Sequence, residues 1–109
     1  MIQVVIWKDS GQQIRGIDLD GHAGYGEEGE DIVCAAVSVL VLNMANSVEA
    51  FTEDGFSGEA APEGGGFSFR FTGEISPESK LLMDSLILGL NQIREEYGEQ
   101  YINIRLKEV

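Results

Sequence analysis

The chain has 109 residues, and 7 Lys and Arg residues against 19 Asp and Glu residues give a formal net charge of −12. This length is typical of one domain, so we expect residues 1–109 to share a single core. The acidic balance argues against direct nucleic-acid binding, because neutralising phosphates requires clustered Lys and Arg side chains. The same charge favours the capture of a basic partner by long-range attraction.

The sequence carries no pattern typical of membrane insertion or secretion. Its longest apolar run, residues 32–42, is shorter than the roughly 20 residues that a membrane span requires. The N-terminal segment lacks a basic region followed by an apolar region and a small-residue cleavage site. The single cysteine, Cys34, has no partner for an internal disulfide and fits a reducing compartment. We therefore expect a cytoplasmic protein that does not contact a membrane.

The first half of the chain predicts two strands and a helix. A β-branched run at residues 2–8 and an alternating run at residues 12–20 are separated by the turn signal at residues 9–11, which predicts a hairpin. From about residue 30 to residue 52, apolar residues recur every three or four positions, which predicts a helix with one apolar face. These residues are Val33, Val37, Leu40, Met44, Val48 and Phe51.

The second half predicts two more strands, a helix and a last strand. Residues 55–61 form a weak, glycine-diluted strand, and residues 67–72 alternate phenylalanine with polar residues as a half-buried strand does. Ser76 and Pro77 predict the start of a helix, because proline loses no needed hydrogen bond at the first helical position. This helix continues to Gly98, and residues 102–107 alternate as a final strand.

The resulting order, β-β-α-β-β-α-β, predicts an α+β two-layer sandwich. After the first strand, the other six elements follow the βαββαβ order of a ferredoxin-like split. Right-handed crossovers place both helices on one face of a largely antiparallel, five-stranded sheet. We expect the extra N-terminal strand to extend that sheet through its hairpin with the second strand.

A glycine-rich stretch connects the second strand to the first helix. The chain has 14 glycines, nearly double the usual share of about 7%, and four of them fall in this stretch: Gly21, Gly24, Gly26 and Gly29. Such a loop adopts positive φ angles and lets backbone amides approach a ligand closely. The only histidine, His22, lies within it, and Cys34 follows in the helix. We therefore expect a flexible loop that carries function.

Dinucleotide binding is one interpretation of this loop. Residues 24–29 match G-x-G-x-x-G after a predicted strand, and Glu49 lies 20 residues beyond Gly29. A pyrophosphate at the helix start, however, would be repelled by the acidic side chains at Glu27, Glu28, Glu30 and Asp31. The chain is also too short for a doubly wound sheet. The charges disfavour this interpretation.

Metal binding is a second interpretation. Asp18, Asp20 and His22 supply oxygen and nitrogen ligands, but their spacing lacks the glycine that an EF-hand loop requires at its sixth position. A zinc site would require a second Cys or His residue, which the chain lacks. Only a weak Mg²⁺ or Ca²⁺ site is left open, and we expect no metal and no other cofactor.

Thiol chemistry is the third interpretation. A thiol is nucleophilic only as the thiolate, and with a helix that begins near Glu30, Cys34 falls in the first turn or just beyond, where the helix dipole favours negative charge. His22 accepts the thiol proton if the loop folds back over the helix start. Asp31 is a candidate to orient His22, and Ser38 lies one turn after Cys34. The surrounding carboxylates disfavour the thiolate, because like charges repel each other.

Residues 21–38 resemble the signature of the ribosomal-processing cysteine protease family, Prp. That pattern is a Gly-His-Ala opening, a Gly-Glu-x-Gly-x-Asp loop and an Ile-Val-Cys-Ala-Ala helix start, and residues 21–23, 26–31 and 32–36 fit its three parts. The resemblance implies a cytoplasmic endopeptidase that removes an N-terminal extension from a large-subunit ribosomal protein, after a hydrophobic stretch ending in aromatic residues. It also implies that Cys34 is the nucleophile, that His22 is the base and proton donor, and that the protein is a homodimer.

A non-catalytic protein that holds a basic ribosomal partner on its acidic face is the alternative. It predicts an inert, buried Cys34, since free cysteine is among the most buried residue types. Under either hypothesis, four residues are candidates to line a hydrophobic groove: Tyr25, Met44, Phe51 and Phe56.

Overall fold

Strands and helices alternate along the chain in the predicted order. The computed structural model describes residues 1–21, 28–60 and 66–109, with the backbone alone for residues 28–31. The described part contains β1 (Ile2–Lys8), β2 (Ile14–Asp20), α1 (Glu28–Phe51), β3 (Phe56–Ala60), β4 (Gly66–Phe71), α2 (Pro77–Tyr97) and β5 (Ile102–Glu108). Helix α1 begins about two residues earlier than the apolar periodicity predicted.

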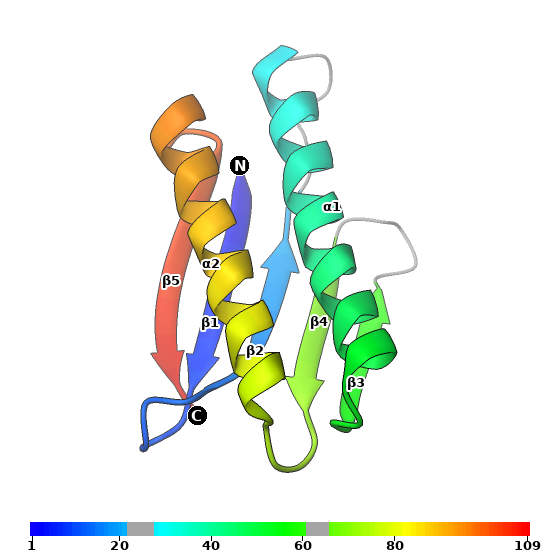
Figure 1. Cartoon of the computed structure of the whole chain (residues 1–109). Helices are drawn as coiled ribbons and strands as arrows, with labels where there is room; N and C mark the ends of the chain where they lie inside the picture. The colour runs from blue at the N-terminus through cyan, green and yellow to red at the C-terminus, as the bar shows by residue number, and fades with distance from the viewer. Residues whose placement is uncertain (22–27, 61–65) are drawn as a thin grey trace.

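The strands form one five-stranded sheet in the order β3-β4-β2-β1-β5. The neighbours β3 and β4, β4 and β2, and β2 and β1 are antiparallel, whereas β1 and β5 run parallel. Both helices cover the same face of this sheet, the near face in Figure 1. The predicted two-layer α+β sandwich with a largely antiparallel sheet is confirmed.

The extra N-terminal strand extends the sheet from inside. The βαββαβ order alone would place β5 beside β2, but β1 lies between them, with Ile6 opposite Ile17 of β2 and opposite Leu106 of β5. The connection from β1 to β2 is short, and the Asp9 carboxylate accepts hydrogen bonds from the backbone N–H groups of Gly11 and Gln13. Such a tight turn reaches only the adjacent strand, so β5 pairs with the other side of β1.

The core lies between the sheet and the helices. Alternate strand residues point toward the helices because successive side chains of a strand face opposite sides. Phe69 of β4 is fully buried, stacks on Phe56 with 4.9 Å between ring centroids, and meets Phe71 edge-on at 5.0 Å. Met44 of α1 is only 3% exposed. Met44, which was a candidate for a groove, is therefore a core residue, and Phe56, the other such candidate, is half-buried and packs against the core.

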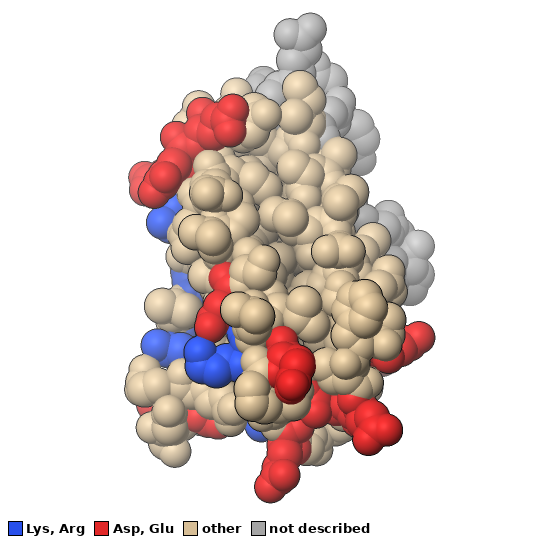
Figure 2. Space-filling view, viewed as in Figure 1, with Lys and Arg blue, Asp and Glu red and all other residues tan. Residues whose placement is uncertain are grey.

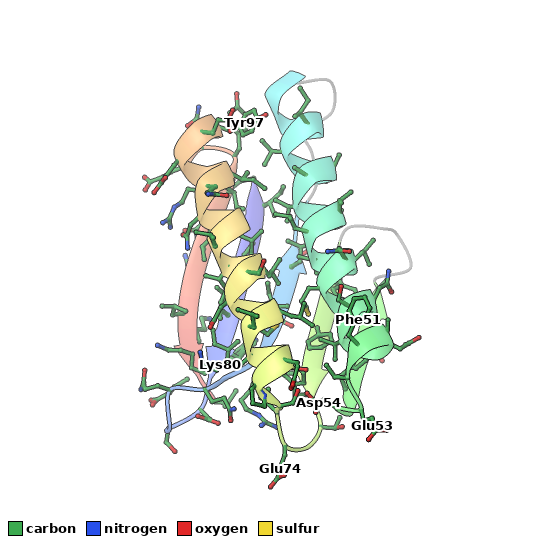
Figure 3. The ribbon with its side chains drawn as sticks, viewed as in Figure 1. Phe51, Glu53, Asp54, Glu74, Lys80 and Tyr97 are labelled. Atoms are coloured by element: carbon green, nitrogen blue, oxygen red, sulfur yellow. The ribbon has the colours of Figure 1, made fainter. Side chains whose placement is uncertain are left out.

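A hydrogen-bonded junction joins the end of α1 to the start of α2. The Ser76 hydroxyl accepts from the backbone N–H of Ser79 at 3.2 Å, and Pro77 follows it, so the predicted helix start is confirmed. The Asp54 carboxylate accepts from the backbone N–H of Ser76 at 3.0 Å and from the hydroxyls of Ser76 and Ser79. Figure 3 shows Asp54 at this lower end of the helix layer.

Helix α1 is apolar on more than its core face. Residues Ile32–Phe51 make a 20-residue stretch long and apolar enough to cross a membrane, although only 33% of it is buried in the described structure. The apolar run of residues 32–42 was an underestimate of this stretch, because Asn43 and Asn46 are isolated polar residues within a longer apolar helix. One face of this helix packs on the sheet, as in core helices of soluble proteins, and residues of the other face, among them Val39 and Leu42, are exposed.

Candidate active site

Cys34 lies on α1 and is half-buried. Since α1 begins at Glu28, six residues before it, Cys34 lies nearly two turns into the helix and not in its first turn. The field of the helix dipole falls off within the first turn. The helix dipole therefore stabilises a Cys34 thiolate less than the predicted helix start implied. Formation of the thiolate then depends more on a nearby proton acceptor.

The Cys34 side chain lines a pocket of about 160 Å³ between α1 and the ends of the neighbouring strands. Five of the lining residues come from α1 itself: Cys34, Val37, Ser38, Val41 and Leu42. The last four follow Cys34 by three, four, seven and eight residues, which places all five on one face of the helix. Apart from the thiol and the Ser38 hydroxyl, this wall is aliphatic.

The sheet supplies the opposite wall. Leu19 of β2 is paired with Phe67 of β4, and Phe67 is in turn paired with Ala60 of β3. All three line the pocket, together with Ile2 and the backbone of Gly66. Pairing across three strands thus places an aromatic ring and a leucine opposite the thiol, and the pocket is apolar on both sides.

Gly21 brings the end of β2 to the same pocket. Its φ of +113° lies in the region that favours glycine, and a Cβ at this position would lie 2.4 Å from the carbonyl oxygen of Met1. The Asp20 carboxylate accepts from the backbone N–H of Gly21 at 2.9 Å. Only glycine fits this turn, and the backbone conformation of Gly21 therefore determines the shape of this part of the pocket.

The predicted site residues have different outcomes. Cys34, Ser38 and Gly21 line one pocket. His22, Gly24, Tyr25 and Gly26 lie outside the described residues, although His22 directly follows Gly21 in the chain. The backbone of Asp31 lies in α1.

Gly29 was expected in the loop, but its backbone also lies in α1, as the second residue of the helix. Acidic residues stabilise a helix start, and the sequence places Glu28, Glu30 and Asp31 around Gly29, which explains why the helix includes this glycine.

Three of the four expected groove residues, Met44, Phe51 and Phe56, do not line the pocket, and the fourth, Tyr25, lies outside the described residues. Met44 packs in the core, Phe56 packs against it, and Phe51 is 76% exposed at the far end of α1, where Figure 3 labels it. The aliphatic wall was available from helical periodicity counted from Cys34. Leu19 and Phe67 were not, because their placement requires the register of β2 against β4.

An acidic depression adjoins the pocket. It shares Leu19, Ala60, Gly66 and Phe67 with the pocket and adds the carboxylates of Asp18, Asp20 and Glu59. Among the described residues, no group of three or more side chains is arranged to hold a metal ion.

Asp18 is held in its charged form on the helix-free side of the sheet. Its carboxylate accepts from the Arg70 guanidinium at 2.9 and 3.0 Å, from the Trp7 indole N–H at 2.9 Å and from the Ser68 hydroxyl at 2.8 Å. Burial raises the pKa of Asp18, but these hydrogen bonds and the charge of Arg70 outweigh burial and lower that pKa.

Comparison with known proteins assigns the family. The model of the family described as cysteine protease Prp matches residues 1–103. The ribosomal processing cysteine proteases Prp of Staphylococcus aureus and Bacillus subtilis are similar to this chain. The first is 33% identical over 106 residues, covering 97% of each chain, and the second is 32% identical over 105 residues, covering 91% of this chain and 92% of the relative.

A solved structure gives the same result. The essential ribosomal processing protease Prp of Staphylococcus aureus, in complex with a substrate peptide, superposes with a TM-score of 0.90 at 29% identity. The match covers 98% of this chain and 100% of that one. The hypothesis of a non-catalytic binding protein is set aside by these matches, which extend over almost the whole chain. The chain belongs to the Prp family of cysteine proteases.

Proposed function

We propose that this protease removes an N-terminal extension from a large-subunit ribosomal protein in the cytoplasm, with Cys34 as nucleophile and His22 as general base. One observation carries the proposal: Cys34 and Gly21, the residue before His22, line the same apolar pocket. His22 directly follows Gly21 in the sequence. A thiol with an imidazole as its proton acceptor makes up a cysteine protease dyad.

The reaction follows from these two groups. His22 takes the proton from the Cys34 sulfur, and the thiolate attacks the carbonyl carbon of the scissile bond to form a tetrahedral intermediate. The protonated imidazole then gives its proton to the leaving amine, and an acyl thioester remains on Cys34. Water, deprotonated by His22, attacks this thioester, and collapse of the second intermediate releases the new carboxylate and restores the thiol.

The oxyanion requires backbone donors other than the N–H of Cys34. Inside a helix, each N–H donates to the carbonyl four residues earlier, so the N–H of Cys34 is already paired with the carbonyl of Glu30. We propose that backbone N–H groups of the glycine-rich segment supply the oxyanion donors.

The walls of the site favour an apolar segment next to a basic one. The pocket of about 160 Å³ accepts a single apolar or aromatic side chain against Val41, Leu42 and Phe67. The adjoining acidic depression attracts basic side chains of the same peptide, and the net charge of −12 attracts a basic protein as a whole. A basic ribosomal protein with an apolar N-terminal extension has both properties.

Intact-mass spectrometry of the extended ribosomal protein tests the proposal. We expect a discrete N-terminal loss with the wild-type protein and no loss with Cys34→Ala or His22→Ala. The matched control is Ser38→Ala, which changes a second polar group of the same pocket and retains cleavage. An unchanged mass with the wild-type protein, or cleavage by His22→Ala at the wild-type rate, contradicts the proposal.

A further inference from the structure

A second cleft lies at the end of the molecule opposite to Cys34. It has a volume of about 310 Å³ and opens between the N-terminal half of α2, β5 and the turn that joins β1 to β2. Its walls are mostly apolar, and the apolar side chains are those of Ile14, Ile75, Met83, Ile87 and Leu106. Small-molecule sites in proteins are mostly apolar cavities of about 300–1,000 Å³. The cleft is therefore large enough for a small ligand.

Strand β2 separates this cleft from the active site. Ile14, the first residue of the strand, lines the cleft, whereas Leu19 lines the pocket that contains Cys34. Five residues of a strand span about 17 Å, at about 3.4 Å per residue. Figure 1 accordingly shows the turn between β1 and β2 at the opposite end of the sheet from the start of α1. A small ligand in the cleft would not contact Cys34.

The ionisable groups at the cleft have a net positive charge. Those among the described residues are Lys8, Lys80 and Asp84. The Lys80 ammonium pairs with the Asp84 carboxylate at 2.8 Å, which leaves the charge of Lys8 uncompensated. Lys8 is half-buried, and its ammonium forms no hydrogen bond or ion pair with the residues that the structure describes. The cleft therefore attracts an anion to Lys8, although the whole chain carries a net charge of −12.

Two amide side chains, those of Gln12 and Gln13, add hydrogen-bond donors to the lining of the cleft. The backbone N–H of Gln12 donates to the carbonyl of Asp9 at 3.0 Å, and the N–H of Asp9 donates to the carbonyl of Gln13 at 2.9 Å. Gln12 has a φ of +66°, in the left-handed region that residues other than glycine rarely adopt. Such backbone conformations are concentrated at functional sites. The backbone that carries these donors is thus fixed before a ligand binds, which lowers the entropic cost of binding.

We propose that this cleft binds a small carboxylate with an apolar body, a ligand distinct from the peptide substrate of the proposed function. The carboxylate pairs with the Lys8 ammonium and accepts from the two glutamine amides, and the apolar body packs against the wall that includes Met83, Ile87 and Leu106. Figure 2 shows Lys and Arg side chains at the lower left of the molecule, over β5 and the N-terminal half of α2, next to tan side chains. A cation with the same apolar body would be repelled by Lys8.

Amide chemical shifts of the full chain, recorded by NMR during a titration with 3-phenylpropanoate at constant ionic strength, test the proposal. We expect saturable shifts at Gln13, Ile87 and Leu106, with a dissociation constant of about 1 mM or tighter for a ligand of this size. The control ligand is 3-phenylpropylamine, which has the same apolar body and the opposite charge. It should bind at least about 10-fold more weakly.

The variant Lys8→Met tests the charge at the cleft. It removes the ammonium and retains an unbranched apolar side chain, so the dissociation constant of 3-phenylpropanoate should rise at least about 5-fold. The matched control is Lys107→Met, which removes the same charge from β5, next to Leu106. The Lys107 ammonium lies 5.9 Å from the centroid of the Trp7 ring, on the other face of the sheet. We expect this control to bind 3-phenylpropanoate within about 2-fold of the wild type.

Several results would overturn the proposal. They are the absence of saturable shifts up to about 10 mM ligand, equal affinity for the carboxylate and the amine, and a Lys8→Met variant that binds like the wild type. Shifts confined to the pocket at Cys34, for example at Leu19 and Ser38, would also contradict it, because they would place the ligand in the active site. The titration does not depend on cleavage, so its outcome is independent of the proposed ribosomal substrate.

Discussion

Cys34 and Ser38 lie one helical turn apart on α1, and both line the apolar pocket. A thiol and a hydroxyl are thus presented side by side to the same substrate. Their chemical roles differ, because the thiol ionises far more readily than the hydroxyl. Substitutions at Cys34 and at Ser38 can therefore be compared directly, since both side chains belong to the same wall of the pocket.

We predict that Cys34→Ala abolishes peptide cleavage and that Ser38→Ala retains it within about 10-fold. In the proposed mechanism the sulfur forms the covalent intermediate, whereas the hydroxyl contributes at most one hydrogen bond, of about 1 kcal/mol. Cleavage of a fluorogenic peptide under single-turnover conditions measures both variants. An equal loss in the two would mean that Ser38 takes part in proton transfer.

Phe67→Ala is predicted to lower kcat/KM by about 10- to 100-fold for a substrate with an apolar side chain at the cleavage site, since it removes apolar contact worth about 1–3 kcal/mol. Phe67 is only half-buried and lines the pocket, so the fold should change little. The control is Phe69→Ala, two residues along the same strand. Phe69 is fully buried, and its loss should lower the free energy of unfolding by about 3–5 kcal/mol.

The helix wall of the site was predictable from the sequence, and the sheet wall was not. Helical offsets from Cys34 identify Val37, Ser38, Val41 and Leu42 without any tertiary information. Phe67 depends on the pairing of Leu19 with Phe67, which the alternating pattern cannot set, because a shift of two residues keeps every side chain on the same face. The same limit made Phe56 and Met44 resemble groove residues, whereas Met44 packs in the core and Phe56 packs against it.

The sheet order was predictable only in part. Alternation and turn signals predict each strand and the first hairpin, but they do not predict whether β5 pairs with β1 or with β2. The short turn at Asp9 places β1 beside β2, so β5 pairs with the free side of β1. Similarly, the exposed apolar residues of α1 were not recognised as a second face, because the polar residues Asn43 and Asn46 lie among them.

Gly21→Ala is predicted to lower both stability and activity. Alanine adopts φ near +113° only with strain, and its Cβ would clash with the carbonyl oxygen of Met1. The chain must then leave β2 along a different path, which alters the part of the pocket that Gly21 lines. Thermal unfolding and peptide cleavage measure the two effects.

Gly73→Ala is the matched control for this prediction. A Cβ at Gly73 meets no other atom within 4 Å, and its φ is not in the positive region. We expect stability and cleavage close to those of the wild type. Equal behaviour of the Gly21 and Gly73 variants would show that the turn after β2 tolerates a side chain.

Asp54→Asn is predicted to remove a pH-dependent part of the stability. Hydrogen bonds from the Ser76 hydroxyl, the Ser79 hydroxyl and the Ser76 backbone N–H lower the pKa of Asp54 in the folded state. A carboxyl with a lowered folded pKa stabilises the fold above its unfolded pKa of about 3.9, and this contribution is lost as the pH falls through the folded pKa. The wild-type protein should therefore be more stable than the variant at pH 7, and the difference should shrink at pH values below about 4.

Urea unfolding of both proteins from pH 7 down to acidic pH measures this difference directly. The neighbouring Glu53→Gln is the control, because Glu53 is exposed and labelled beside Asp54 in Figure 3 but is not part of the junction with Ser76 and Ser79. Taking wild type minus variant at each pH cancels the titration of the other carboxylates, provided that they do not contact Asp54. A difference that stays constant with pH would mean that the junction depends on the shape of residue 54 and not on its charge.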